Sequence, residues 1–125
     1  MHENEISGIV IQICYEIHTT LGPGLLESVY EEILCYELKL RGIPFERQKG
    51  IPVIWKEIKM KIGFRSDIIV DRKVLVELKS VEAIARSHPK ITLTYIRLCK
   101  LKLGLLINFG APTLKEGITR LVNNL

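Results

Sequence analysis

In the stretch Phe64–Ser80 (FRSDIIVDRKVLVELKS), the acids Asp67 and Glu77 and the lysine Lys79 lie among apolar residues of strand character. The stretch predicts two short strands joined at Asp71-Arg72-Lys73, with Asp67 on the first strand and Glu77 and Lys79 on the second. If the turn centres on the middle residue of that triplet, Asp67 and Glu77 are directly opposite each other. Because side chains alternate between faces along a strand, Lys79 joins them on the same face.

This spacing has a chemical consequence for the two carboxylates. Directly opposed side chains on neighbouring strands have Cβ atoms roughly 4.5–5.5 Å apart. Carboxylates that close repel each other, and apolar surroundings strengthen the repulsion. A divalent cation would relieve it, since carboxylate oxygens suit Mg²⁺ or Mn²⁺, and water and a substrate phosphate can fill the other coordination positions. The alternative is a solvated hairpin face on which the acids and the lysine form cross-strand salt bridges.

Hydrophobic periodicity predicts two helices ahead of this hairpin. Apolar side chains recur at three- and four-residue steps over Ile6–Leu21, and Gly22-Pro23-Gly24 ends that helix. A second helix is expected at once, from Leu25 to about Leu40. Glu27 lies in its first turn, where an acid usually compensates the helix dipole but could instead reach the strand pair on which the helix packs.

Basic residues alternate with apolar ones just before the acidic pair. Residues 43–55 are extended in character, and their prolines permit only an edge strand or a broken one. After them, Lys59, Lys61 and Arg65 would share the face of Asp67 if the alternation continues without a bulge. Such a basic track would hold a phosphate backbone near the metal. The alternative is that these lysines only block pairing at a sheet edge.

A third helix is expected after the hairpin, starting at Pro89, which suits a first helical position, and running to about Lys102. Its inner side is predicted to carry Ile91, Tyr95 and Leu98, with Leu101 as a further candidate. Its outer side is basic and includes Arg86, Lys90, Arg97, Lys100 and Lys102.

The C-terminal part of the sequence begins with the continuous apolar run Leu103–Phe109, closed by Gly110. Such a run predicts a central strand that is covered on both faces. The tail, Leu114–Leu125, is expected to form a short helix or strand.

Length and composition indicate one globular domain spanning residues 1–125, since 47% of the residues are hydrophobic and 26% are charged. The net charge of +4 favours polyanionic partners only mildly. No apolar run reaches the roughly 20 residues that cross a membrane, and the first residues lack the form of a signal peptide. The three cysteines are far apart and lack metal-binding spacing, which is typical of reduced core thiols. These features predict a cytoplasmic protein.

The order of elements, together with Asp67 and Glu77-x-Lys79, resembles the PD-(D/E)XK restriction-endonuclease-like superfamily. More narrowly, Gly24-x-x-Glu27-x-x-Tyr30 is similar to the signature of the small GxxExxY proteins. The likeness covers nearly the whole chain and continues through Leu21-Gly22-Pro23, Glu37-Leu38, Arg41-Gly42-Ile43, Phe64-x-x-Asp67, Val76-Glu77-Leu78-Lys79 and Gly104–Gly110. The resemblance implies an α/β (α+β) fold with a mixed central sheet flanked by helices.

The resemblance also implies roles for individual residues. Asp67 and Glu77 would hold the metal, with the backbone carbonyl of Leu78 as a further ligand. Lys79 would orient or help to deprotonate the attacking water, and Glu27 would be an accessory carboxylate from the preceding helix. Contacts to nucleic acid are expected from Lys59, Lys61, Arg65, Arg86, Lys90 and Tyr95.

One position departs from the family pattern, which has a helix of the form Gln-x-x-x-Tyr. Here Ile91 precedes Tyr95 by four residues, and its apolar side chain cannot assist at an active site or contact nucleic acid as a polar one would. Two functions therefore remain open: a Mg²⁺- or Mn²⁺-dependent nuclease that cuts DNA, and a non-catalytic module that binds nucleic acid or a protein partner. Small nucleases of this class often pair to reach both strands, so a homodimer is a further expectation.

Overall fold

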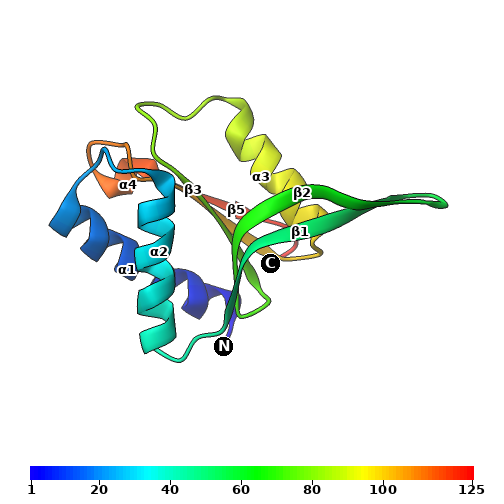
Figure 1. Cartoon of the computed structure of the whole chain (residues 1–125), viewed down its shortest axis with the longest axis horizontal. Coiled ribbons are helices and arrows are strands. Elements are labelled where there is room, and N and C mark those ends of the chain that lie inside the picture. Colours follow the sequence, from blue (N-terminus) through cyan, green and yellow to red (C-terminus); the bar gives the residue numbers. More distant parts are fainter.

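The computed structural model describes all residues from 1 to 125 and contains one five-stranded sheet with helices on both sides (Figure 1). In chain order the elements are α1 (Glu3–Leu21), α2 (Glu27–Leu40), β1 (Phe45–Trp55), β2 (Ile58–Val70), β3 (Val74–Lys79), α3 (Ser87–Leu98), β4 (Leu103–Asn108), α4 (Leu114–Gly117) and β5 (Ile118–Val122). The strand order is β1-β2-β3-β4-β5, in which only the β3–β4 pair is parallel. The α+β fold with a mixed sheet is confirmed, and it is consistent with a restriction-endonuclease-like core.

The two N-terminal helices form where the periodicity predicts them, within about three residues at their starts. Helix α1 ends at Gly22, whose φ of 77° is in the left-handed region and whose N–H donates to the His18 carbonyl at 2.8 Å. Helix α2 follows after a short loop and ends at Leu40, as predicted. None of the helices is both long enough and apolar enough to span a membrane.

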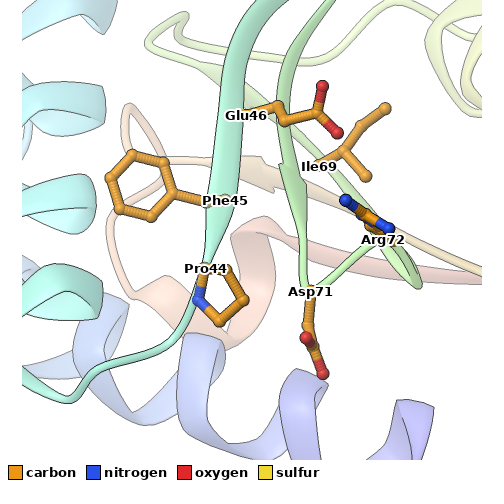
Figure 2. A pocket seen from close by; sticks show the side chains of 6 residues that line it. All are labelled: Pro44, Phe45, Glu46, Ile69, Asp71 and Arg72. Atoms are coloured by element: carbon orange, nitrogen blue, oxygen red, sulfur yellow. The ribbon is translucent and has the colours of Figure 1, made fainter.

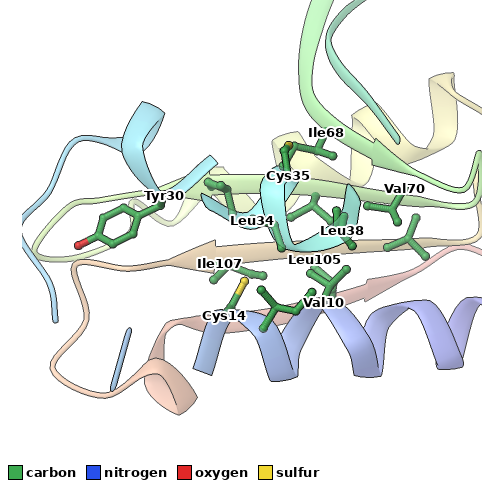
Figure 3. Close-up of a cluster of buried hydrophobic side chains, with 14 of the residues drawn as sticks. Val10, Cys14, Tyr30, Leu34, Cys35, Leu38, Ile68, Val70, Leu105 and Ile107 are labelled. Atoms are coloured by element: carbon green, nitrogen blue, oxygen red, sulfur yellow. The ribbon is translucent and has the colours of Figure 1, made fainter. Parts of the chain in front are cut away.

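The main core lies between helices α1 and α2 and one face of strands β2, β3 and β4 (Figure 3). It consists of 20 buried residues, among them Val10, Cys14, Tyr30, Leu34, Leu38, Ile68, Val70, Leu105 and Ile107. Each fully buried aliphatic side chain contributes about 1.5–3 kcal/mol to folding through removal of apolar surface from water. This packing fixes the angle of α2 against the sheet and therefore places the acids of α2 beside the strands.

The other face of the sheet is covered by α3 through a smaller apolar layer. Leu75 of β3 pairs with Gly104 of β4, so both lie on the same face. A Cβ at position 104 would lie 2.7 Å from Cγ2 of Ile96, so the glycine leaves the space that Ile96 occupies. The packing of Ile96 into this gap brings α3 close to the sheet.

Helix α3 differs from its prediction in its end and in its inner face. It stops at Leu98 instead of near Lys102, because Lys100 adopts a left-handed conformation with a φ of 57° and donates its N–H to the Arg97 carbonyl. The predicted inner face is also wrong in part. Ile91 and Leu98 are exposed, and the buried residues are Thr92 and Ile96, because the gap at Gly104 receives Ile96.

The hairpin of β2 and β3 has the predicted register. Its pairs are Ile68 with Val76, Ile69 with Leu75 and Val70 with Val74. The turn uses two left-handed residues, Asp71 and Arg72, with φ values of 50° and 56°. After β3 the chain forms α3 and then β4. All six residues of β4 are buried, as its continuous apolarity predicts.

Strands β1 and β2 continue past the sheet as a projecting hairpin arm, residues 49–65 (Figure 1). Strand β1 is an edge strand, as its prolines predict. The ladder of the arm shifts register between Ile51 and Val53, so the unbroken alternation considered from the sequence is not present. The C-terminal tail forms both a short helix, α4, and the edge strand β5.

Candidate active site

Asp67 and Glu77 lie where the ladder between β2 and β3 ends. The last backbone pair toward this end is Ile68 with Val76. One step further, the Asp67 N–H donates to Oε1 of Glu77 at 3.2 Å, and the Leu78 N–H donates to Oδ2 of Asp67 at 2.9 Å. Each carboxylate thus accepts a main-chain hydrogen bond from the opposite strand, and the two acids are held together as the register predicts.

The surroundings of Glu77 oppose its ionisation. Its residue surface is only 8% exposed. Burial, followed by the negative charge of Asp67, raises the pKa of the Glu77 carboxyl, while the Asp67 N–H and the positive charge of Lys79 lower it, and the net result is a pKa of about 8. Two carboxylates in this arrangement share a site that favours an added positive charge, whether a proton or a cation.

Helix α2 adds two more carboxylates to the same region. A pocket of about 380 Å³ is lined by Glu27, Ser28, Glu31, Gln48, Asp67 and Leu78. Glu27 and Glu31 are four residues apart and therefore lie on one face of the helix. Glu31 was not among the residues predicted from the sequence, although its spacing from Glu27 was a usable signal.

Glu31 is largely neutralised by strand β1. Arg47 donates to Oε2 of Glu31 from Nε at 3.1 Å and from Nη2 at 2.9 Å. Gln48 donates to Oε1 of Glu31 at 2.8 Å, and the same Nε2 lies 3.4 Å from Oδ1 of Asp67. Gln48 therefore bridges the acid of α2 and the acid of β2. Its φ of 48° is unusual for a non-glycine residue in a strand, and no sequence signal indicated it.

Glu27 reaches the end of β3, which is the second of the two roles considered for it. Its Oε2 accepts a hydrogen bond from the Ser80 N–H at 3.3 Å. The Ser80 hydroxyl donates to the Leu25 carbonyl at 2.6 Å, so the start of α2 and the end of β3 are joined twice. Glu27 therefore lies beside the residue that follows Lys79.

The tyrosine of the Gly24-x-x-Glu27-x-x-Tyr30 pattern holds the loop before α2. The Tyr30 hydroxyl donates to the Gly22 carbonyl at 2.7 Å and accepts from the Leu25 N–H at 3.1 Å. Its ring stacks on Phe109 with centroids 4.1 Å apart. Gly24 has a φ of 105°, a conformation that side-chain-bearing residues rarely adopt. The three residues of the pattern thus shape the loop that presents Glu27.

Lys79 is the last residue of β3, and the segment after it is fixed by Asn108. The Lys79 carbonyl accepts from the Phe109 N–H at 2.8 Å. The Asn108 side chain donates to the Val81 carbonyl at 2.9 Å, and its Oδ1 accepts the N–H groups of Val81 and Gly110, each at 3.0 Å. These bonds tie the chain on both sides of Lys79 to β4.

The backbone alternation of β3 directs the Leu78 carbonyl to the β2 side of the strand. In a strand, the N–H and C=O of one residue point to the same side, and successive residues alternate. The Leu78 N–H donates to Asp67, whereas the Lys79 carbonyl accepts from Phe109 on the β4 side. Leu78 therefore presents both of its main-chain polar groups to the acidic side.

Tyr95 of α3 lies on the side of the acidic pair. Its ring stacks on Phe64 with centroids 3.9 Å apart. Burial raises the pKa of the Tyr95 hydroxyl, and the charges of Glu77 and Asp67 raise it further. Ile91, one helical turn earlier, is 40% exposed.

The predicted basic residues are dispersed over the surface. Arg65 is near the acids, since its Nη1 donates to the Gln48 carbonyl at 3.2 Å. Lys59 and Lys61 lie further out in the hairpin arm, and Arg86 and Lys90 are exposed around the start of α3. The structure therefore does not gather them into one cluster at the carboxylates.

A separate pocket of about 430 Å³ lies at the opposite end of the β2–β3 hairpin (Figure 2). It is lined by Pro44, Phe45, Glu46, Ile69, Asp71 and Arg72. Neither Asp67 nor Glu77 belongs to this lining, so the pocket is unrelated to the acidic site.

The donor atoms of the acidic site are those that hard divalent cations prefer. Asp67 and Glu77 contribute carboxylate oxygens, and the Leu78 carbonyl is directed to the same side. No group of three or more His, Cys, Asp or Glu side chains is arranged as a complete metal site. Such a partial set fits Mg²⁺, which usually keeps several waters and substrate phosphate oxygens as ligands.

Comparison with models of protein families tests the family membership that the sequence motifs indicate. The model of the PD-(D/E)XK nuclease superfamily matches residues 4–121, almost the whole chain. The chain belongs to the PD-(D/E)XK nuclease superfamily. Comparison with curated proteins and with solved structures found no significant match. The matched range spans the positions of Glu27, Asp67, Glu77 and Lys79.

Proposed function

We propose that this PD-(D/E)XK protein is a metal-dependent nuclease that hydrolyses the phosphodiester bonds of DNA. The observation that carries the proposal is the mutual holding of Asp67 and Glu77 at the point where β2 and β3 separate, with Lys79 two residues further on. Membership of the superfamily supports the same reaction. Asp67, Glu77 and the Leu78 carbonyl would hold Mg²⁺ or Mn²⁺.

The residues of the site divide the work of hydrolysis. A bound divalent cation would lower the pKa of a coordinated water and neutralise charge on the phosphate. Lys79, whose charge acts on Glu77, would orient the attacking water, help to remove its proton and stabilise the negative charge that develops on the phosphate oxygens. Glu27, held against Ser80, would bind a water at the edge of the pocket as an accessory carboxylate.

The contacts of Gly24, Glu27 and Tyr30 support placing the chain among the GxxExxY proteins. Each of the three residues has a distinct part in shaping the loop beside the acidic site, so their joint presence has a structural reason. The single domain over residues 1–125, the cytoplasmic location and the homodimer inferred from the sequence remain predictions.

A second candidate function is a module that binds nucleic acid or a protein partner without cutting. The observation that favours it is Ile91, which is exposed one turn before Tyr95 and provides no polar group at the position where the family pattern has Gln. This change leaves the carboxylates and Lys79 intact.

The test of the proposed function is cleavage of supercoiled plasmid and of single-stranded DNA in Mg²⁺ or Mn²⁺. Replacing both metal-site acids, in a variant carrying Asp67→Ala and Glu77→Ala, is expected to reduce the cleavage rate by about 10³-fold or more, because charge stabilisation at the phosphate is lost. A matched control, Glu16→Ala with Glu116→Ala, removes two exposed acids from α1 and α4 and should cut at the wild-type rate.

Two outcomes would contradict the nuclease assignment. Cleavage that survives loss of both acids would show that another site or a contaminant is responsible. A wild-type protein that cuts neither substrate, and whose Ile91→Gln variant also cuts neither, would leave the binding module as the better description.

A further inference from the structure

The hairpin arm carries the largest exposed feature that the proposed chemistry does not use. It extends beyond the helices and the rest of the sheet (Figure 1). Five large apolar side chains on it are between 39% and 65% exposed: Ile54, Trp55, Ile58, Met60 and Ile62. Such a group of exposed apolar side chains on a narrow ribbon indicates a contact surface.

The charge of the arm indicates what kind of partner it contacts. Residues 49–65 contain five basic residues and one acidic residue: Lys49, Lys56, Lys59, Lys61, Arg65 and Glu57. Their net charge of +4 equals that of the whole chain, so the remaining residues are neutral in sum. The excess positive charge of the protein is therefore concentrated on the arm, which suits a polyanion.

The same charge opposes pairing of two arms. In a two-fold dimer, the same surface patch of each subunit meets its copy. Contact between two arms would bring their lysines together with Glu57 as the only acid on each arm to offset them. Like charges facing each other across strands are destabilising. A nucleic-acid backbone presents the opposite charge and avoids this repulsion.

The dimensions of the arm fit a groove of duplex DNA. From Lys49 to Trp55 a strand of this length spans roughly 20 Å at about 3.3 Å per residue. The major groove is about 12 Å wide and 8.5 Å deep and admits a two-stranded β-ribbon, whereas the minor groove is only about 6 Å wide. The arm is therefore long enough for its end to reach the floor of the major groove.

The faces of the arm separate two kinds of contact. Trp55 pairs with Ile58, and Ile54 pairs with Lys59, so the aromatic side chain and the lysine lie on opposite faces. Arg65 pairs with Gly50 on the other side of the register shift, where a Cβ on Gly50 would lie 3.2 Å from Cγ1 of Ile62. Near the end of the arm, one face thus carries Lys59 beside Ile54 and the other carries Trp55 and Ile58, so phosphates and base edges such as thymine methyl groups can be contacted from different faces.

We propose that the hairpin arm enters the major groove of duplex DNA and selects duplex over single-stranded substrate. This inference rests on the proposed nuclease function. Lys59, Lys61 and Arg65 contact phosphates beside the groove, and Trp55 contacts base edges. Because β2 runs from the end of the arm to Asp67, a duplex seated on the arm has a fixed orientation toward the carboxylates.

The chain contains a single tryptophan, so Trp55 reports on the arm alone. Wild-type protein in EDTA, which prevents cleavage, is titrated with a labelled 20-base-pair duplex and with a single strand of equal length. Anisotropy of the label is expected to show duplex binding at least about tenfold tighter than single-strand binding. Tryptophan emission should shift or be quenched on duplex binding, since the exposed indole enters the groove.

A pair of matched variants isolates the charges of the arm. Lys59→Ser with Lys61→Ser should weaken duplex binding and lower the slope of log affinity against log salt by about 2, one for each lost phosphate contact. Lys39→Ser with Lys115→Ser removes the same charge from exposed positions on α2 and α4 and should leave the slope unchanged. These lysines are exposed, so both variants should fold.

The outcomes separate this inference from the proposed function. The arm would not be the binding element if the duplex binds without changing Trp55 emission and if both double-lysine variants have the same slope of log affinity against log salt. That result would leave the nuclease function standing. Equal affinity for the single strand would overturn duplex selection. A Trp55 emission change that depends on protein concentration without DNA would show a protein interface instead. Failure to bind either DNA would overturn the arm as the binding element, whereas the nuclease function is decided separately by the cleavage assay.

Discussion

At the residue scale, the decisive feature is the pair Asp67 and Glu77 at the end of the β2–β3 hairpin. Their carboxylates accept main-chain hydrogen bonds where the backbone ladder stops. The positions of Asp67 and Glu77 were predictable, because their distance from the turn alone sets their register. Gln48 was not predictable, because its contact with Asp67 depends on a left-handed backbone conformation in a neighbouring strand. Glu31 was detectable only from its four-residue spacing to Glu27.

The pKa of Glu77 predicts a pH dependence of stability in the metal-free protein. The pKa is about 4.5 in the unfolded chain and about 8 in the folded state. Between these values the folded protein binds more protons than the unfolded chain, so the free energy of unfolding falls as pH rises from about 4.5 to about 8 and levels off above. Urea unfolding in EDTA measures this decline in the free energy of unfolding. Because each unit of pKa shift corresponds to about 1.4 kcal/mol, the decline should amount to a few kcal/mol.

A neutral side chain at this position should remove the decline. Glu77→Gln is therefore expected to be more stable than wild type at pH 8 and similar to it at pH 4.5. Glu116→Gln, at an exposed position on α4, serves as the control and should retain the wild-type decline. Parallel curves for Glu77→Gln and wild type would show that Glu77 titrates as an ordinary surface acid.

At the element scale, loops and helix faces position the site. The sequence predicted some of these elements well and others poorly. Helices α1 and α2 followed from periodicity and glycine signals, because each has a one-sided apolar stripe. The inner face of α3 was assigned wrongly, because its packing depends on the space left by Gly104 of another element. The projecting arm was not predicted either, since alternation describes a strand without stating what covers it.

The loop before α2 yields a prediction about Tyr30. Tyr30→Phe removes the hydroxyl that joins Gly22 and Leu25 but keeps the stacking on Phe109. The loss of these buried hydrogen bonds should reduce the free energy of unfolding by about 1–3 kcal/mol. Urea unfolding of the variant measures this reduction.

Tyr36→Phe is the matched control, because Tyr36 lies on the same helix with most of its surface exposed. It should unfold as the wild type does. Equal stability of the Tyr30→Phe and Tyr36→Phe variants would mean that the hydroxyl of Tyr30 does not hold the loop.

At the scale of the whole molecule, the sheet brings together residues from three separate elements. Glu27 comes from α2, Asp67 from β2, and Glu77 and Lys79 from β3. The class of fold and the approximate elements were predictable from pattern and resemblance. The joining of Glu27 to Ser80 was not, because it depends on how α2 packs across the core.

The central claim is that Asp67 and Glu77 together hold a divalent cation, and calorimetric titration with Mg²⁺ and Mn²⁺ tests it most directly. Wild type and the Glu16→Ala, Glu116→Ala control are expected to bind one ion with the same affinity. The Asp67→Ala, Glu77→Ala variant should show no binding, provided that its circular dichroism is that of a folded protein. Equal binding by the folded site variant, or no binding by wild type, would contradict the claim.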